Sequence, residues 1–225
     1  MKMKLEIDHI YICVKKDAPE IKILQEAGLM LAPEITYHIG QGTASVFFNF
    51  ENFYLEFIWI ENLDELKEAD RNLAEKFEHS SDGGSPFGIG LHRCNLLNDA
   101  LPFKTYSYYS EWMKSGTTIE IVKTKHPNEP KIFVVPQYMN WKSAVNEYPK
   151  LLDTTQLKAG IKTLTNILFT IPQFNNTSKA MKILDEQGII KFQSGDKHIL
   201  ELTFDDFKNN KTIEAYPKLP LNIKY

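Results

Sequence analysis

Histidine and glutamate side chains in two separate segments are the residue types in this chain that could do chemistry. His9 lies in the segment Ile7-Asp8-His9-Ile10, and Glu56 lies in Tyr54-Leu55-Glu56-Phe57. An imidazole and a carboxylate are borderline ligands for a divalent metal ion, and a carboxylate alone can act as a proton-transferring base. The pair therefore predicts a metal site or acid–base chemistry, provided that the fold brings the two side chains together.

Two ligands do not complete a metal site. Catalytic zinc commonly takes three protein ligands, and non-haem iron takes two histidines and a carboxylate. The nearest further donors are His38, His92 and Glu201. The alternative interpretation is a hydrogen-bonded pair of His9 and Glu56 inside an apolar pocket, since buried polar groups routinely pair. The sequence leaves both interpretations open.

A glycine-containing segment, His38-Ile39-Gly40-Gln41-Gly42-Thr43, could hold an oxygen atom of a ligand. Glycine allows close backbone approach, and exposed amides near Gly42 and Thr43 could hold a carboxylate or carbonyl oxygen. The alternative is an ordinary β-turn, which glycines also favour. His38 and Thr43 are thus candidates for substrate binding.

A third candidate segment, Gly88-Ile89-Gly90-Leu91-His92-Arg93, reads as a strand. Alternation lets only one of its last two residues face a pocket, and an inward Arg93 would favour an anionic substrate. The remaining histidines, at positions 79, 126 and 198, are expected to be solvated loop residues.

Strand alternation must position the candidate residues. Between residues 5 and 14 it places His9 and Tyr11 on one face, together with Leu5, Ile7 and Cys13. Around Glu56 it places Tyr54, Glu56 and Ile58 on one face. If these two strands are neighbours in one sheet, His9 and Glu56 converge above it.

The elements around these strands form a β-α-β-β-β unit that is complete by about Ile60. A helix is expected to begin near Asp17 and Pro19 and to end at Gly28. A hairpin is expected across Glu51-Asn52. Farther along the chain we expect an amphipathic helix over 62–78, strands near 87–94, 104–110, 117–123 and 132–137, an irregular stretch over 140–160 and a polar tail after 205. The expected units are a first module over 1–62, a connecting helix and linker over 63–85, a second, mostly strand module over 86–140, and a C-terminal half-module over 141–225.

The opening strand and helix are nearly repeated later in the chain. The segments 7–14 and 22–29 resemble 164–171 and 182–189, and the strand that carries Glu56 resembles the one that carries Glu201. Repetition of this unit predicts two half-folds that share one core, with a site where they meet. The copies differ at the candidate residue, because Asn166 stands where the first copy has His9.

Composition is that of an ordinary globular protein. The chain has 225 residues, 43% of them apolar, and a net charge of −3. Such a charge disfavours nucleic acid as a partner. The sequence has neither an apolar signal core nor an apolar run long enough to span a bilayer, so we expect a cytoplasmic location without membrane contact. Cys13 and Cys94 lack CxxC spacing, which gives no indication of a disulfide framework or a thiolate metal site.

The segments around His9, Gly40 to Thr43 and Glu56 together resemble the vicinal oxygen chelate superfamily, and within it the glyoxalase-like domain proteins of bacteria. The resemblance implies an α+β fold of repeated β-α-β-β-β modules that form a curved, cup-shaped mixed sheet, as in glyoxalase, bleomycin-resistance and dioxygenase proteins. It implies a pocket that contains His9, Tyr11, Tyr54 and Glu56 and suits a small oxygen-bearing molecule.

By position, the resemblance implies metal ligation by His9 and Glu56, with Glu201 as the matching glutamate of the repeat. If residues 87–94 open the second module, its ligand position holds Ile89. The activity implied is that of a metal-assisted lyase, isomerase or dioxygenase in which Glu56 is ligand or base. The alternative is a non-catalytic module of the same fold that sequesters a small molecule without metal. A monomer and a homodimer are both compatible with the resemblance.

Overall fold

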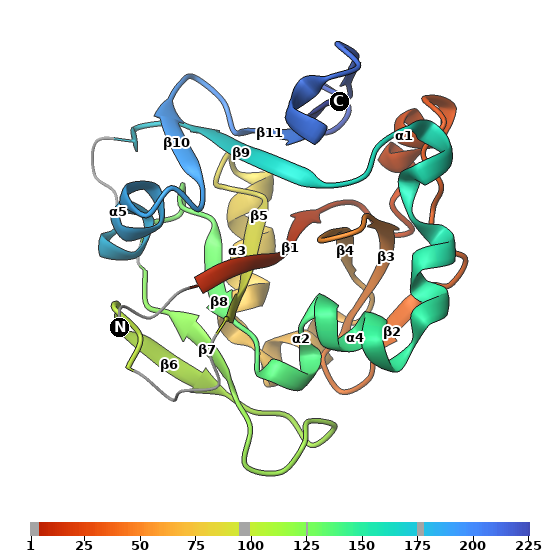
Figure 1. Ribbon diagram of the computed structural model, residues 1–225. Coiled ribbons are helices and arrows are strands. Elements are labelled where there is room, and N and C mark those ends of the chain that lie inside the picture. Colours follow the sequence, from red (N-terminus) through yellow and green to blue (C-terminus); the bar gives the residue numbers. More distant parts are fainter. Residues whose placement is uncertain (1–4, 95–99, 125, 175–177) are drawn as a thin grey trace.

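Two mixed β-sheets organise the chain in the computed structural model, which describes residues 5–94, 100–124, 126–174 and 178–225. Within those residues, the large sheet has eight strands and the small sheet has five (Figure 1). Helices lie beside the sheets and not between every pair of strands, so the α+β class predicted from the sequence is confirmed.

The large sheet is built around an antiparallel pair, β1 (Leu5–Cys13) and β5 (Phe87–Arg93). On one side β4 runs parallel to β1, and on the other side β8 runs parallel to β5. The full strand order is β2 (Thr36–His38), β3 (Thr43–Asn49), β4 (Tyr54–Ile60), β1, β5, β8 (Lys131–Val134), β7 (Ile119–Val122) and β6 (Thr105–Tyr108). The two halves mirror one another in order, as paired modules require.

The small sheet contains the C-terminal strands. Its order is β10 (Lys191–Ser194), β9 (Leu164–Ile171), β11 (Ile199–Phe204), β13 (Leu221–Lys224) and β12 (Thr212–Glu214). Figure 1 shows β9 and β11 alongside one side of the central β1 and β5 strands. The helices are α1 (Lys22–Glu26), α2 (Leu63–Ala69), α3 (Arg71–Ser81), α4 (Trp141–Glu147) and α5 (Lys179–Glu186). None of these helices is long and apolar enough to cross a membrane.

The main hydrophobic core lies between the two sheets. Aromatic contacts join them: the rings of Phe50 and Phe204 stack at 4.3 Å, and those of Phe87 and Phe169 meet edge to face at 5.2 Å. Alternate residues of β1, such as Ile10, belong to this core and have no exposed surface. The residues between them therefore face the other side of the large sheet.

A β-bulge at Asp8 changes the alternation predicted for β1. Ile7 pairs with Leu91 and His9 pairs with Gly90, so Asp8 is an extra residue in β1. The bulge places Ile7 against the core between the sheets, on the face opposite His9. The sequence had predicted Ile7 and Leu5 on the same face as His9, and that part of the prediction is wrong because regular alternation cannot anticipate a bulge.

Two helices differ from their predicted extents. Ala18 and not Asp17 precedes the first helical turn, and both residues have positive φ, so α1 is reached through a short 3₁₀ turn and spans only five residues. The helix expected over 62–78 is two helices. Asp70, with φ of −149°, ends α2, and its carboxylate accepts the backbone N–H of Leu73 to cap α3.

The C-terminal third contains more regular structure than expected. The stretch predicted to be irregular contains α4, which Asn140 caps through the backbone N–H of Ser143. The polar tail after 205 contributes β12 and β13, and β13 runs parallel to β11. Short elements with few apolar residues give weak periodic patterns, which is why the sequence did not predict them.

The two similar segments of the chain fold into different sheets. β9 and α5 do repeat a strand followed by a helix, but β9 pairs with β10 and β11, whereas β1 pairs with β4 and β5. β11 is antiparallel to β9, although β4 is parallel to β1. The similarity is therefore local, and β5 to β8 form the half of the large sheet that complements β1 to β4.

His198, expected to be a solvated loop residue, is partly buried beside Phe87. Burial and the nearby Lys76 ammonium lower its pKa to about 4 from an ordinary value of 6.5. As pH falls below about 6.5, the unfolded chain binds a proton at this residue before the folded chain does. We therefore expect the free energy of unfolding to decline between pH 6.5 and pH 4 more steeply for the wild type than for His198→Gln. Urea denaturation across this range measures the difference, and parallel profiles would contradict the prediction.

Candidate functional site

A pocket of about 320 Å³ opens on the face of the large sheet that lies opposite the main core. Side chains of β1, β2, β3, β4 and β8 line it, and β6, β7 and Trp112 in the segment between them complete its wall. The pocket brings His9 and Glu56 together, so the convergence predicted from strand alternation is confirmed. The reason is that β1 and β4 are adjacent and parallel, with Tyr11 opposite Glu56 in register.

His9 is held in place from three directions. Its Nδ1 donates a hydrogen bond of 2.7 Å to Oδ2 of Asp8, the bulged residue. Its ring stacks on Tyr54 at 4.5 Å and meets Phe133 edge-on at 5.3 Å. A carboxylate only accepts hydrogen bonds, so Nδ1 carries the proton and Nε2 presents its lone pair to the pocket.

The buried carboxylate of Glu56 lies between two imidazoles. Its Oε2 is 3.8 Å from Nε2 of His9, and its Oε1 is 3.8 Å from Nε2 of His38. Only 6% of Glu56 is exposed. A separation of 3.8 Å is too long for a hydrogen bond, so the arrangement leaves room for an atom that contacts both partners.

His38 reaches Glu56 from the short edge strand β2. Its Nδ1 lies 2.8 Å from the Thr43 hydroxyl, and its Nε2 lies 3.3 Å from the Ser45 hydroxyl. β2 and β3 pair in register, with His38 opposite Thr43, so these contacts follow from the hairpin. Both hydroxyls fix the direction of the imidazole, and Thr43 acts through its side chain where the sequence had predicted its backbone amide.

Two glycines of β5 make space for the rings of β1. A Cβ atom added at Gly90 would lie 2.5 Å from Cε1 of His9, and one added at Gly88 would lie 1.9 Å from Cε1 of Tyr11. Ile89, between them, faces the main core and has no exposed surface. Ile89, which the sequence put at the ligand position if residues 87–94 open the second module, therefore does not face the pocket. β5 presents glycine at the positions opposite His9 and Tyr11.

Tyr11 contributes a hydrogen-bond donor to the pocket. It is 4% exposed, and its hydroxyl has no hydrogen-bond partner among the described residues. Burial raises the pKa of Tyr11 well above its ordinary value, and the negative charge of Glu56 adds to the effect. The phenol therefore stays protonated and can donate to an oxygen atom of a bound molecule.

The remaining wall is mostly apolar and carries one ion pair. Lys131 Nζ lies 2.6 Å from Oδ2 of Asp70, and both side chains are nearly buried. Burial lowers the pKa of Lys131, and the Asp70 carboxylate opposes that shift. Because the two charges compensate one another, they supply no strong field for a highly charged ligand.

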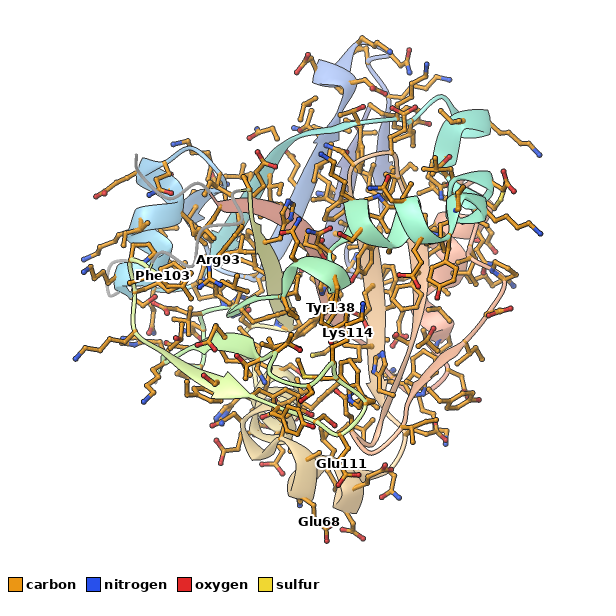
Figure 2. All side chains as sticks on the ribbon, turned by 60° about the horizontal axis from the view of Figure 1, so that its bottom comes forward. Glu68, Arg93, Phe103, Glu111, Lys114 and Tyr138 are labelled. Carbon is orange, nitrogen blue, oxygen red and sulfur yellow. The ribbon has the colours of Figure 1, made fainter. Side chains whose placement is uncertain are left out.

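The segment between β6 and β7 covers part of the pocket. Trp112 lies in the pocket wall although 45% of its surface is exposed. The segment is attached at Lys114, whose backbone N–H donates to the Tyr138 hydroxyl at 3.1 Å and whose ammonium lies 4.5 Å from the centre of the Tyr138 ring. Figure 2 shows these two side chains next to one another.

Three predicted site residues lie outside the pocket lining. Glu201 is in β11 of the small sheet, where its carboxylate pairs with Lys224 at 2.8 Å. Arg93 is at the end of β5, opposite Leu5. A Cβ atom at Gly42 would meet the backbone oxygen of Asn62 at 2.2 Å, so this glycine allows the start of α2 to pack closely and does not face a ligand. Tyr11, Tyr54, His38 and Thr43 do line the pocket.

Three residues that shape the site were not predicted from the sequence: Asp8, Gly88 and Gly90. An aspartate directly before His9 in an apolar strand is an unusual buried charge, and this signal was available. The roles of the glycines depend on the pairing of β1 with β5, which no local pattern gives. Asp8 is 1% exposed and is as much part of the site as His9 is.

The metal ion that the resemblance implies can be tested against these residues. His9, His38 and Glu56 offer two imidazole nitrogens and a carboxylate, a set that suits divalent transition metals. Ligands bound at about 2.1 Å would lie roughly 3 to 3.5 Å apart, slightly less than the 3.8 Å separations here. In the part of the chain that the structure describes, no choice of one donor atom from each of these three residues places all three atoms within 4.8 Å of one another. The donors therefore fit in kind, but at least one pair of them would have to approach by more than about 1 Å to bind one ion.

Comparisons with known proteins concern the fold. No family model and no curated protein sequence matches the chain. A hypothetical protein from Staphylococcus aureus superposes with a TM-score of 0.61 and 11% identity over 99% of both chains. Methylmalonyl-CoA epimerase from Mycobacterium tuberculosis superposes with a TM-score of 0.34 and 11% identity, over 58% of this chain and 86% of its own. The full-length match shows that both sheets occur together in another protein.

Proposed function

We propose that this chain is a vicinal-oxygen-chelate-like protein whose pocket binds a small oxygen-bearing molecule and moves a proton on it. The reaction class is that of a lyase or isomerase, with dioxygenase-type chemistry as a further option for a redox-active metal. The observation that carries the proposal is the buried Glu56 carboxylate, 3.8 Å from an imidazole nitrogen on each side. A location in the cytoplasm and the absence of nucleic acid and membrane partners remain predictions from composition.

Glu56 is the group proposed to transfer the proton. Its carboxylate faces the pocket with the two imidazole nitrogens at a distance that leaves an atom-sized space. A base acts on a substrate proton only within hydrogen-bond reach, and this space offers such a position. The Tyr11 hydroxyl would donate to the substrate oxygen on which negative charge develops.

A divalent metal ion would be held by His9, His38 and Glu56, with water or substrate oxygens as further ligands. Bound there, it would supply Lewis-acid polarisation of a carbonyl or enediolate oxygen. The hydrogen bond from His9 to Asp8 supports this assignment, because a carboxylate behind a histidine fixes the tautomer that metal ligation needs. His38 would complete the set by giving up its contact with the Ser45 hydroxyl, because that contact uses the same Nε2 atom.

The pocket lining favours a small and weakly charged substrate. Aromatic and aliphatic side chains such as Tyr54, Phe133 and Ile121 form much of the wall, and the ion pair of Lys131 with Asp70 is internally compensated. A molecule with two vicinal oxygens and an apolar part would satisfy both the polar centre and the wall.

The second candidate function is a binding module without metal. The aromatic lining, including Phe47, Tyr54 and Trp112, favours it because rings can hold an apolar molecule by stacking alone. In that case His9 and Glu56 would be structural. Monomeric and homodimeric forms suit either function.

Metal content and catechol binding test the proposal. Catechol is a simple aromatic molecule with two vicinal oxygens. We expect protein purified without chelators to carry metal in the pocket, and we expect the metal-loaded protein to bind catechol. His9→Ala and Glu56→Gln should each weaken Co²⁺ binding in the pocket by roughly 100-fold. Loss of a residue behind a ligand costs up to about 100-fold in metal affinity, and loss of a ligand itself should cost at least as much. Elemental analysis measures the metal content, and isothermal titration calorimetry measures the affinities for Co²⁺ and catechol.

Glu201→Gln is the matched control, because it removes a glutamate that pairs with Lys224 outside the pocket. Its metal content and catechol affinity should equal those of the wild type. If metal-free protein binds catechol, and the His9→Ala variant binds it equally well, the result would favour the binding module. A protein that binds neither metal in the pocket nor catechol would overturn both functions.

A further inference from the structure

A second group of metal-binding side chains lies at the other end of the β1–β5 pair. Glu6 pairs with His92 across the two strands, and Cys94 follows two residues after His92. One donor atom of each residue lies within 4.8 Å of the others. Arg93, labelled in Figure 2, marks this end of β5. Because Glu6 and His92 are direct partners in this pair, their side chains lie on the same face of the sheet.

His92 is oriented in the same way as His9. Its Nε2 lies 3.6 Å from Oε2 of Glu6, and its Nδ1 lies 3.8 Å from Oδ1 of Asp8. His9 likewise presents Nδ1 to Asp8 and Nε2 to a glutamate. The buried Asp8 carboxylate therefore stands behind both imidazoles, the position that an outer carboxylate takes behind a metal-bound histidine.

The donor atoms of this group are spaced so that they can share one bound ion. His92 Nδ1 is buried and has no hydrogen-bond partner among the described residues. The Nε2 atom and the Glu6 carboxylate are too far apart for a direct hydrogen bond but are close enough to share a third atom. A metal ion at that position would contact nitrogen, oxygen and sulfur together, because one donor atom of each residue lies within 4.8 Å of the others.

We propose that Glu6, His92 and Cys94 bind a zinc ion through a carboxylate oxygen, imidazole Nε2 and a thiolate. The thiolate and imidazole exclude Mg²⁺ and Ca²⁺, which prefer oxygen, and three protein ligands leave the fourth tetrahedral position for water. The Cys94 thiol loses its proton to solvent when the metal binds. Glu6 and His92 also line a separate cavity of about 420 Å³, toward which that fourth position would open.

Nothing in the sequence indicated a thiolate metal site, because neither cysteine has CxxC spacing. CxxC spacing is the usual sequence signal, and here the ligands come from two strands whose pairing is long-range. Cys13 does not share this environment, since burial raises its thiol pKa to about 12. The ligands differ from those in the pocket, so this site and the proposed function stand or fall separately.

Cobalt substitution distinguishes the two sites. The full-length, reduced and metal-stripped protein is titrated with Co²⁺ and followed by absorbance. We expect a thiolate-to-cobalt charge-transfer band in the near ultraviolet, displaced by Zn²⁺. Cys94→Ser should abolish the band, His92→Gln and Glu6→Gln should weaken Zn²⁺ binding by roughly 100-fold, and Cys13→Ser and Glu56→Gln should retain the band.

Cobalt binding without a charge-transfer band in the wild type would overturn this site while leaving the pocket proposal intact. A band that persists in Cys94→Ser and disappears in Cys13→Ser would also overturn it. Circular dichroism of each variant verifies that the fold is retained, and Glu6→Gln, a largely exposed position, keeps the test decisive if a change at His92 affects folding.

Discussion

Gly90→Ala is expected to destabilise the protein by about 2 kcal/mol and to abolish metal binding in the pocket. The added methyl group would lie 2.5 Å from Cε1 and 2.6 Å from Nδ1 of His9, closer than real Cβ contacts allow. The imidazole has little room to retreat, because Tyr54 stacks on it and Asp8 holds Nδ1. A single methyl group therefore acts on both the stability and the orientation of His9.

A double-mutant cycle identifies the contact responsible. In the His9→Ala background the ring is gone, so Gly90→Ala should cost much less than in the wild type. Gly88→Ala should behave in the same way toward Tyr11, where the contact of 1.9 Å is still shorter. Urea denaturation gives the four free energies of each cycle. Additive costs would show that the rings are not what these glycines accommodate.

Gly28→Asn is a control for glycine replacement in general. Gly28 has a φ of +92°, and a Cβ atom there would meet nothing within 4 Å. Asparagine adopts positive φ more readily than other non-glycine residues, so the change should cost less than about 1 kcal/mol. Co²⁺ affinity in the pocket should be unchanged in this variant.

Local patterns in the sequence were sufficient for the elements that hold His9 and Glu56. Period-2 alternation in two strands, with a hairpin before the second, places both residues toward one side if the strands are adjacent. The parallel pairing of β1 with β4 confirms that condition. The metal and catalytic roles of these residues remain predictions.

Long-range pairing explains what the sequence could not supply. The contact of β1 with β5 joins segments about 80 residues apart. Only this pairing places Gly88 and Gly90 opposite Tyr11 and His9, where they leave space for the rings. The bulge at Asp8 reverses the alternation of β1 upstream of His9, so Glu6 and not Ile7 faces His92. Glu201 was chosen from a repeat that is similar in sequence but lies in another sheet. Repeats identify similar elements, whereas pairing decides where they lie.

Asp8→Ala is expected to lower the free energy of unfolding by about 3 to 5 kcal/mol, because each of two buried N–H donors that lose their acceptor costs about 1 to 3 kcal/mol. The Asp8 carboxylate accepts the His9 Nδ1–H at 2.7 Å and the backbone N–H of Trp141 at 2.6 Å. Both donors would be left buried without this acceptor. The melting temperature should fall by roughly 10 °C, as measured by calorimetry.

Asp205→Ala is the matched control for burial. The Asp205 carboxylate also accepts two N–H groups, from Lys162 and Thr163, but in a more exposed setting. Water can replace the lost acceptor there, so the cost should be about 1 kcal/mol. Equal costs at the two aspartates would contradict the importance assigned to the burial of Asp8.

Asp8→Asn separates the structural role of Asp8 from its effect on the His9 tautomer. The asparagine oxygen can still accept the Trp141 N–H, so most of the stability should remain. Its amide group would then donate toward His9 Nδ1, which moves the imidazole proton to Nε2 and blocks the lone pair that faces Glu56. We expect a folded protein that binds Co²⁺ in the pocket about 100-fold more weakly, with the loss measured by calorimetry. Unchanged affinity in a folded Asp8→Asn protein would show that Nε2 of His9 is not a metal ligand, and Glu56 would then act in a pocket without metal.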